Sequence, residues 1–245
     1  MVPSACGRRA VTGMRHAVRP VRDEWDRRGW ALIPGLVGSG ELAALRGEAE
    51  RLWADQSHFA VRGAVPNSPT RSDRLDPFID LSPVFAGLAR NPRLLAAVGE
   101  VLGSEPQLMK DKFIFKPGGS GGYEAHQDGA YWQGLGLDLG RFLTAFLFLD
   151  DATADNGAVQ CTSGQHRGLL TAPGVIADPS EDQLDDFTLV EAAAGDLLLV
   201  HALTPHRSGP NRTSAMRRAL AFTYGVDARP DIYSLYQQIR QGNRS

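Results

Sequence analysis

Cysteine, lysine and long apolar runs are all scarce in this chain of 245 residues. Its two cysteines, Cys6 and Cys161, stand far apart and form no CxxC pair. Two isolated thiols exclude a disulfide framework and favour a reducing, cytoplasmic compartment. No segment approaches the roughly 18 to 20 apolar residues that a membrane-spanning helix needs, so no membrane partner is expected.

An excess of positive charge is also missing. The 26 basic residues are balanced by 28 acidic ones, which gives a formal net charge of −2. Because a nucleic-acid-binding protein is expected to carry a basic excess, the composition favours a small-molecule substrate over a nucleic-acid partner. The sequence gives no indication of the oligomeric state.

The first 22 residues contain five arginines and no acid. This segment is predicted to be a disordered leader, with an arginine-rich transit peptide as the alternative. The rest of the chain, residues 23–245, contains no internal repeat, low-complexity tract or compositional break. It is therefore expected to form a single domain.

Apolar residues in the first third of the chain recur at helical spacing. Helices are predicted over Asp23–Arg28, Ser39–Asp55, Val84–Arg90 and Pro92–Leu102. Ser39 is the expected N-cap of the second helix. A short strand is expected at Gly29–Pro34, and a long loop over Gln56–Pro77.

After Pro106, short apolar runs alternate with clusters of Gly, Pro, Asn and Asp. This texture is typical of a β-sandwich or barrel. Strands are predicted at Leu108–Phe115, Phe142–Leu149, Gly157–Cys161, Phe187–Glu191, Leu197–His201 and Ala219–Gly225. Together with the earlier helices they predict an α+β fold, in which N-terminal helices pack on a β core.

The segment Tyr123–Gly129 carries the strongest chemical signal. In a strand, His126 and Asp128 would share a face, about 6–7 Å apart. Alone, this pattern equally fits a surface histidine beside an aspartate, but His206, 80 residues further on, offers a third ligand. Two imidazoles and one carboxylate form the facial triad of non-heme Fe(II) oxygenases. His201 is expected to be a packed histidine instead.

A possible cosubstrate anchor follows the third ligand. Arg217 lies 11 residues after His206 and carries a guanidinium whose fork matches a carboxylate. Ser208 can donate a further hydrogen bond, and the two are expected to hold the distal carboxylate of 2-oxoglutarate. Adjacent residues of a strand face opposite sides, so only one of Arg217 and Arg218 can point inward, and Arg217 is favoured.

The only three lysines fall at positions 110, 112 and 116 and share one strand face. Lys112 is predicted to touch the cosubstrate or the substrate, and Lys110 to touch the substrate. The alternative is a solvated face, because Phe113 and Phe115 have the opposite parity and need a core. Thr144 is a further candidate for cosubstrate binding.

Two aromatic residues that follow the His-x-Asp motif, Tyr131 and Trp132, are candidate substrate contacts. The glycine-rich segment Gln133–Gly140 after them could act as a lid. Three arginines of the long loop could recognise an anion, although a solvated loop is favoured. They are Arg62, Arg71 and Arg74.

From about Asp23 to Tyr236 the chain resembles the phytanoyl-CoA dioxygenase family of Fe(II)- and 2-oxoglutarate-dependent oxygenases. Four ordered segments carry the resemblance: Gly29–Leu36, Lys116–Gly118 with His126–Asp128, Asp155–Val159 with Ser163–Arg167, and His206–Asn211 with Arg217. The chain departs from the family at residues 161–163, where Cys-Thr-Ser replaces the usual Val-Pro-Gly run.

The resemblance implies a double-stranded β-helix, a cupin-like jelly roll. It also implies that His126, Asp128 and His206 bind iron and that Arg217 and Ser208 bind 2-oxoglutarate. Related halogenases replace the acid with a small residue. Because this chain keeps Asp128, hydroxylation of an unactivated C–H is expected, with O₂ as oxidant and succinate and CO₂ as coproducts. The expected substrate is a small metabolite or natural-product intermediate.

Other functions remain open. The same site could catalyse desaturation, cyclisation or epimerisation. The protein could also be a non-catalytic module that binds iron or 2-oxoglutarate. A zinc hydrolase is less favoured, because the sequence contains no HExxH motif and no evident general base.

Overall fold

The computed structural model describes residues 20–62, 73–170, 176, 187–226 and 231–242. Residues 1–19 of the expected leader therefore lie outside the described residues. Val21 and Arg22, at the end of that expected leader, form the first turn of helix α1 (Val21–Arg28).

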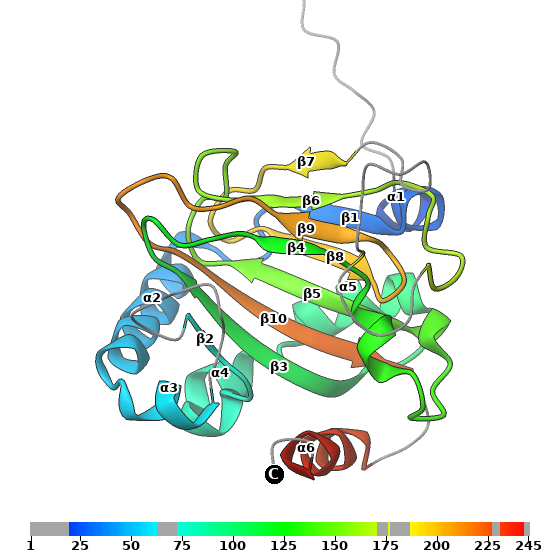
Figure 1. Cartoon of the computed structure of the whole chain (residues 1–245), viewed down its shortest axis with the longest axis horizontal. Helices are drawn as coiled ribbons and strands as arrows, with labels where there is room; N and C mark the ends of the chain where they lie inside the picture. Colours follow the sequence, from blue (N-terminus) through cyan, green and yellow to red (C-terminus); the bar gives the residue numbers. More distant parts are fainter. Residues whose placement is uncertain (1–19, 63–72, 171–175, 177–186, 227–230, 243–245) are drawn as a thin grey trace, which may run out of the picture.

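Two antiparallel sheets lie face to face (Figure 1). The strands of the larger sheet are, in spatial order, β1 (Trp30–Ile33), β8 (Leu197–His201), β5 (Phe142–Phe148), β10 (Arg217–Gly225), β3 (Gln107–Lys116) and β2 (Arg74–Leu75). Those of the smaller sheet are β4 (Tyr123–His126), β9 (His206–Ser208), β6 (Val159–Cys161) and β7 (Thr188–Val190). The α+β class and the jelly-roll core are confirmed.

Helices cover the outer face of the larger sheet (Figure 1). Besides α1 they are α2 (Ser39–Ala54), α3 (Ser57–Arg62), α4 (Pro83–Leu88) and α5 (Pro92–Leu102), with α6 (Ile232–Gly242) beside β3. The main core joins buried side chains of these helices to Phe113, Phe115 and Phe222 of the sheet.

A second apolar cluster fills the space between the two sheets. It includes Ile114, Phe146 and Ala221 of the larger sheet and Val159 of the smaller one. The larger sheet is therefore buried on both faces, which explains why β5 is apolar at six of its seven positions.

Local signals account for most helix boundaries. Pro92 opens α5, Asn91 accepts a hydrogen bond from the next turn, and Gly103 ends the helix with a φ of 73°. The predicted cap at Ser39 is wrong, because Ser39 is already helical and Gly38 precedes it without a side-chain cap.

The long loop expected over Gln56–Pro77 also needs correction. It contains α3 and the short strand β2, which pairs with β3. Pairing with an existing strand supplies the hydrogen bonds that a two-residue strand cannot provide for itself, and this contact is invisible in the local sequence. Within the described part of the chain, no helix is long and apolar enough to cross a membrane.

Candidate active site

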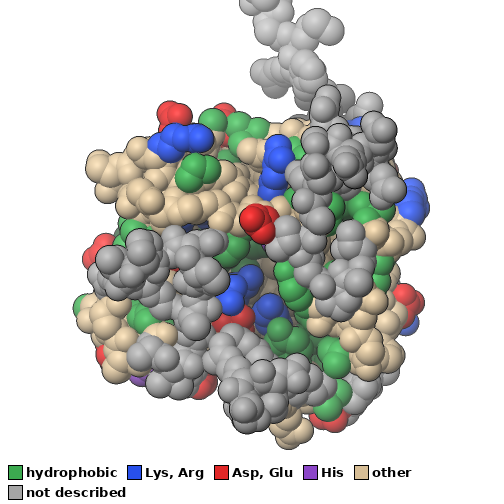
Figure 2. Space-filling view, viewed as in Figure 1, with side chains coloured by type: hydrophobic (Ala, Val, Ile, Leu, Met, Phe, Trp, Pro, Cys, Tyr) green, Lys and Arg blue, Asp and Glu red, His purple; other side chains and the backbone are tan. Residues whose placement is uncertain are grey.

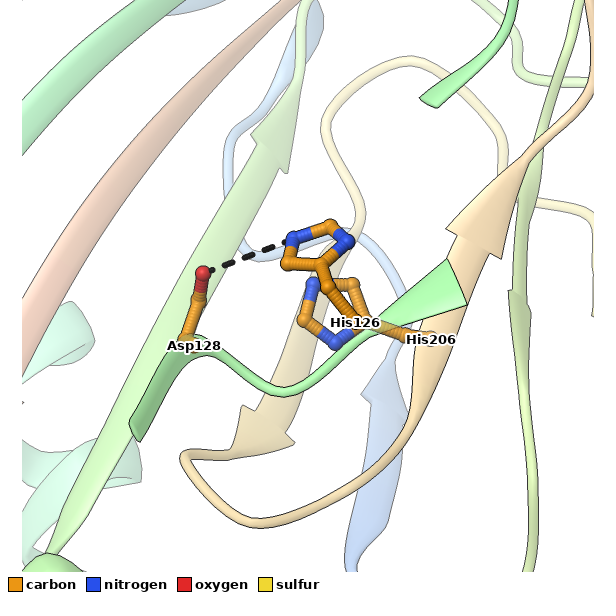
Figure 3. Close-up of side chains that lie close together, drawn as sticks. All are labelled: His126, Asp128 and His206. Atoms are coloured by element: carbon orange, nitrogen blue, oxygen red, sulfur yellow. Dashed lines mark ion pairs between the residues drawn. The ribbon is translucent and has the colours of Figure 1, made fainter. Parts of the chain in front are cut away.

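Three elements bring the predicted triad together. His126 ends β4 and is paired with His206 at the start of β9, while Asp128 opens the short 3₁₀ helix η2 (Asp128–Trp132). One ligand atom from each lies within 4.8 Å of the others, and His126 Nε2 is 3.7 Å from Asp128 Oδ1 (Figure 3). The expected strand thus stops before Asp128, and the turn of η2 aims the carboxylate at the imidazoles.

Backbone carbonyls fix the orientation of both imidazoles. His126 Nδ1 donates to the carbonyl of Glu124 over 2.8 Å, and His206 Nδ1 donates to that of Thr204 over 3.0 Å. Each ring therefore presents Nε2 to the shared space between the residues, which is how metal-binding histidines are usually held. Burial, followed by the neighbouring His126, lowers the pKa of His206 to about 4, so this ring is neutral and able to bind a metal.

The carboxylate of Asp128 is held in a similar way. Thr144 Oγ1 donates to its Oδ2 over 2.6 Å and lies 3.2 Å from the hydroxyl of Thr223. This leaves Oδ1 facing the imidazoles. Burial opposes the charge of Asp128, but the contact with His126 and the nearby His206 outweigh it and hold the pKa well below its usual value. Two imidazoles and an ionised carboxylate are ligands that fit Fe(II).

A second cluster lies at the other end of the pocket. Arg217 of β10 pairs with Lys116 of β3 and is only 3% exposed. Its Nη2 donates to the carbonyl of Gly157 over 3.1 Å, while its Nε is buried without a partner in the described structure. Lys116 Nζ donates to Ser208 Oγ over 2.9 Å and to the carbonyl of Gly209.

Neither of these two buried cations forms an ion pair with any described residue. Burial lowers the pKa of Arg217 to about 10, and burial together with Arg217 lowers that of Lys116 to about 7. A pair of buried cations without a carboxylate is costly unless an anion binds between them. The cluster therefore fits the distal carboxylate of 2-oxoglutarate.

The neighbouring Arg218 lies on the opposite side of the strand. Its Nε donates to Asp150 over 2.8 Å, and Asp150 Oδ2 also accepts from the Arg218 backbone N–H. The structure therefore places Arg217, the favoured arginine of the two, inside the pocket. Ser208 also lines the pocket.

The lysines at positions 110 and 112 share the inner face of β3 with Lys116, and Lys112 lines the same pocket as the triad. The alternative of a solvated face is wrong, because Lys112 lines the pocket and Lys110 lies beside Asp76 and the ring of Tyr236. Thr144 lies against Asp128, and a contact between it and 2-oxoglutarate stays a prediction.

The two aromatic candidates, Tyr131 and Trp132, lie in different environments. Tyr131 is 51% exposed, with its ring 6.0 Å from that of His126, so it stands at the rim of the site. Trp132 is 1% exposed and packs in a separate cluster with Met109 and Phe142. Its predicted substrate contact is wrong, because the turn of η2 directs it into the core.

Sequence reasoning assigned no role to Lys116 and favoured a solvated loop for Arg74. Lys116 was visible in the Lys-Pro-Gly triplet that precedes the metal motif, but nothing local distinguished it from the other lysines. Arg74 lies on β2, and its Nε is buried. Only the pairing of β2 with β3 places it opposite Ile114, which lines the pocket.

A jelly roll that carries this triad beside an unpaired cation cluster defines the class of 2-oxoglutarate-dependent non-heme iron dioxygenases. The chain belongs to the phytanoyl-CoA dioxygenase (PhyH) family, whose model matches residues 25–219. It is accordingly an Fe(II)- and 2-oxoglutarate-dependent dioxygenase, as the motifs predicted.

Individual relatives agree with this assignment. The methylphosphonate hydroxylase of Gimesia maris is 29% identical over 220 residues, which cover 87% of this chain and 83% of that protein. The ectoine dioxygenase of Halomonas elongata is 29% identical over 226 residues, covering 82% and 68% respectively. Among solved structures, EctD from S. alaskensis with bound Fe has a TM-score of 0.74 at 22% identity, covering 90% and 85%, and shares the fold.

Proposed function

We propose that the protein hydroxylates a C–H bond of a small polar metabolite and consumes 2-oxoglutarate and O₂ to yield succinate and CO₂. His126, Asp128 and His206 hold the iron, and Arg217, Lys116 and Ser208 hold the distal carboxylate of 2-oxoglutarate. One observation carries the proposal: a complete and oriented triad shares a pocket with Arg217, and neither Arg217 nor its strand neighbour Lys116 forms an ion pair with a described carboxylate.

Bound iron with 2-oxoglutarate would supply O₂ activation coupled to decarboxylation of the keto acid. The protein itself contributes by holding the three iron-binding side chains in fixed orientations. Glu124 and Thr204 fix the two rings through their carbonyls, and Thr144 fixes the carboxylate. Apolar side chains between the sheets exclude water from the space where the C–H bond must approach.

The relatives support a small polar substrate. One is named for hydroxylation of methylphosphonate and the other for oxidation of ectoine. The two matches cover 87% and 82% of this chain. The cytoplasmic location and the single domain over residues 23–245 also belong to this proposal, supported by the two isolated cysteines and the absence of a compositional break.

An anaerobic titration of metal-free protein with Fe(II) and 2-oxoglutarate tests the site. We expect the weak visible charge-transfer band of the iron chelate in wild type, its loss in Asp128→Ala, and a large rise in the 2-oxoglutarate concentration needed in Arg217→Ala. Arg218→Ala, which removes the same charge from the outer side, is the matched control and should behave as wild type. A band that forms equally in all four proteins would refute the assignment.

Aerobic succinate release then separates an enzyme from a binding module. Substrate-stimulated succinate with a product 16 mass units heavier supports hydroxylation. A product lighter by two mass units would instead indicate desaturation or cyclisation. A product of unchanged mass would indicate epimerisation. Binding of iron and 2-oxoglutarate without any succinate would support the non-catalytic module.

A further inference from the structure

The inner wall of the pocket carries a second group of basic side chains, separate from the cosubstrate anchor. Lys110 and Lys112 lie on β3, and Arg74 lies on β2 opposite Ile114. Paired residues of antiparallel strands point to the same face, and Ile114 faces the pocket. All three cations therefore belong to the wall that faces the smaller sheet. Figure 2 shows basic side chains beside acidic ones in a hollow on one face of the molecule.

These cations have few partners in the described structure. Lys112 forms no hydrogen bond or ion pair there, and the Nε of Arg74 is buried and unpartnered. Lys110 Nζ stands 3.9 Å from Asp76 Oδ2, a long ion pair, and 5.6 Å from the centroid of the Tyr236 ring. Among the described residues, only Lys110 of these three cations forms an ion pair.

Among the described residues, Asp76 pairs with Lys110, and neither of the other two acids nearby forms an ion pair with Lys112. Asp128 faces the histidines of the triad and is used by the metal. Both carboxylate oxygens of Asp73 are buried without a partner among the described residues, and burial raises the pKa of this group. Burial, followed by repulsion from Lys110, lowers the pKa of Lys112 to about 8. An anion bound beside Lys112 would remove the cost of burying this charge.

2-Oxoglutarate is too short to contact all of the basic side chains on this wall. Lys110 lies six residues from Lys116 along β3, or about 20 Å in an extended strand. A five-carbon diacid anchored at Arg217 is too short to reach Lys110. Lys112 lies between these two ends, beside the triad, where a substrate must place its reacting carbon.

We propose that the substrate is a small organic oxyanion whose carboxylate or phosphonate group is bound by Lys112, with Lys110 and Arg74 completing the site. This inference rests on the proposed function, because it takes Asp128 and the Arg217–Lys116 pair as occupied by iron and 2-oxoglutarate. A charged headgroup held on this wall would fix which C–H bond of the substrate faces the metal. Lys112 is then a determinant of specificity for anionic substrates.

Anaerobic isothermal titration of the Fe(II)- and 2-oxoglutarate-loaded protein tests the inference with three probes: methylphosphonate, propionate and propan-1-ol. We expect saturable binding of at least one anion and none of the alcohol. The anion that binds more tightly identifies the headgroup. Binding of propan-1-ol as tight as that of the anions, or no binding of either anion, would overturn the proposal.

Variants locate the binding. Lys112→Met should weaken binding of the anion about 10- to 100-fold, as expected for loss of a hydrogen bond to a charged group, and Lys112→Arg should restore most of it. Arg93→Met, which removes an exposed cation paired with Glu41, is the matched control. Wild-type affinity in Lys112→Met would refute the assignment.

The charge-transfer band of the same samples separates the possible failures. A normal band in Lys112→Met with weakened anion binding supports a substrate site. Loss of the 2-oxoglutarate chelate in that variant would make Lys112 a cosubstrate residue and overturn the inference. Absence of the band in wild type would instead refute the proposed function itself.

Discussion

Replacing Arg217 with methionine should have opposite effects on cosubstrate binding and on folding stability. The guanidinium is buried, keeps one hydrogen bond to Gly157, and has no ion pair among the described residues. Burial lowers its pKa to about 10, which corresponds to a cost of about 3 kcal/mol for keeping the charged form in the fold. The substitution removes this cost but also removes the hydrogen bond to Gly157, which reduces the gain in stability by about 1 kcal/mol. The metal-free variant should therefore be as stable as wild type, or up to about 2 kcal/mol more stable.

Cosubstrate affinity should fall in the same variant. A charge-assisted pair with a carboxylate contributes about 1.5–3 kcal/mol, so the 2-oxoglutarate concentration at half-saturation should rise about 10- to 100-fold. Urea denaturation of the metal-free protein measures the first effect, and anaerobic titration of the charge-transfer band measures the second.

Arg218→Met is the matched comparison. This arginine is bonded to Asp150, and the side chains are 13% and 18% exposed. Its loss should destabilise the fold by about 1–3 kcal/mol and leave 2-oxoglutarate affinity unchanged. The reasoning is refuted if Arg217→Met destabilises the protein as much as Arg218→Met does and binds 2-oxoglutarate normally.

Three further predictions concern residues around the site. Thr144→Val removes the hydrogen bond to Asp128 and should weaken Fe(II) binding about tenfold by metal titration, while unchanged affinity would argue against an orienting role. Burial lowers the pKa of His201 to about 4, below its unfolded value of about 6.5. Between these two pH values the unfolded state binds a proton that the folded state does not. The free energy of unfolding should therefore fall by up to about 3 kcal/mol as the pH drops from 6.5 to 4. His201→Asn should flatten this pH dependence in urea melts, and an unchanged slope would contradict it. Gly157→Ala should destabilise the fold by about 1–3 kcal/mol, because φ is +78° there and a Cβ would overlap a neighbouring backbone carbonyl oxygen. Gly134→Ala is the control, since Gly134 has a φ of +83° but lies in open space. It should destabilise the fold less in the same urea assay.

Short-range patterns in the sequence predicted much of the fold. Helical spacing predicted α2 and α5 almost to their ends, and the apolar runs predicted β5 and β8. These elements follow from the local demand to bury an apolar stripe or face, so they can be read without knowing the neighbours.

That the residues of the candidate metal triad come together was predictable, because their chemistry is unusual and their motif is local. Two residues of the triad lie within three positions, and the third stands at the start of a motif of its own. The orientation of the Asp128 carboxylate was not predictable, since it depends on Thr144, which lies on another strand and donates to Asp128.

By itself, the sequence determined which residues share a face of each strand and which side chains can bind iron. Only the tertiary structure decided what covers each face. On β3, the parity of the lysines and of Phe113 and Phe115 was evident, but either set could have faced solvent. Helices bury the phenylalanines, while the lysines lie on the side that carries the pocket, where Lys116 is fully buried and Lys112 faces residues of the smaller sheet. Burial is a property of what packs opposite, and those partners come from segments far away in the chain.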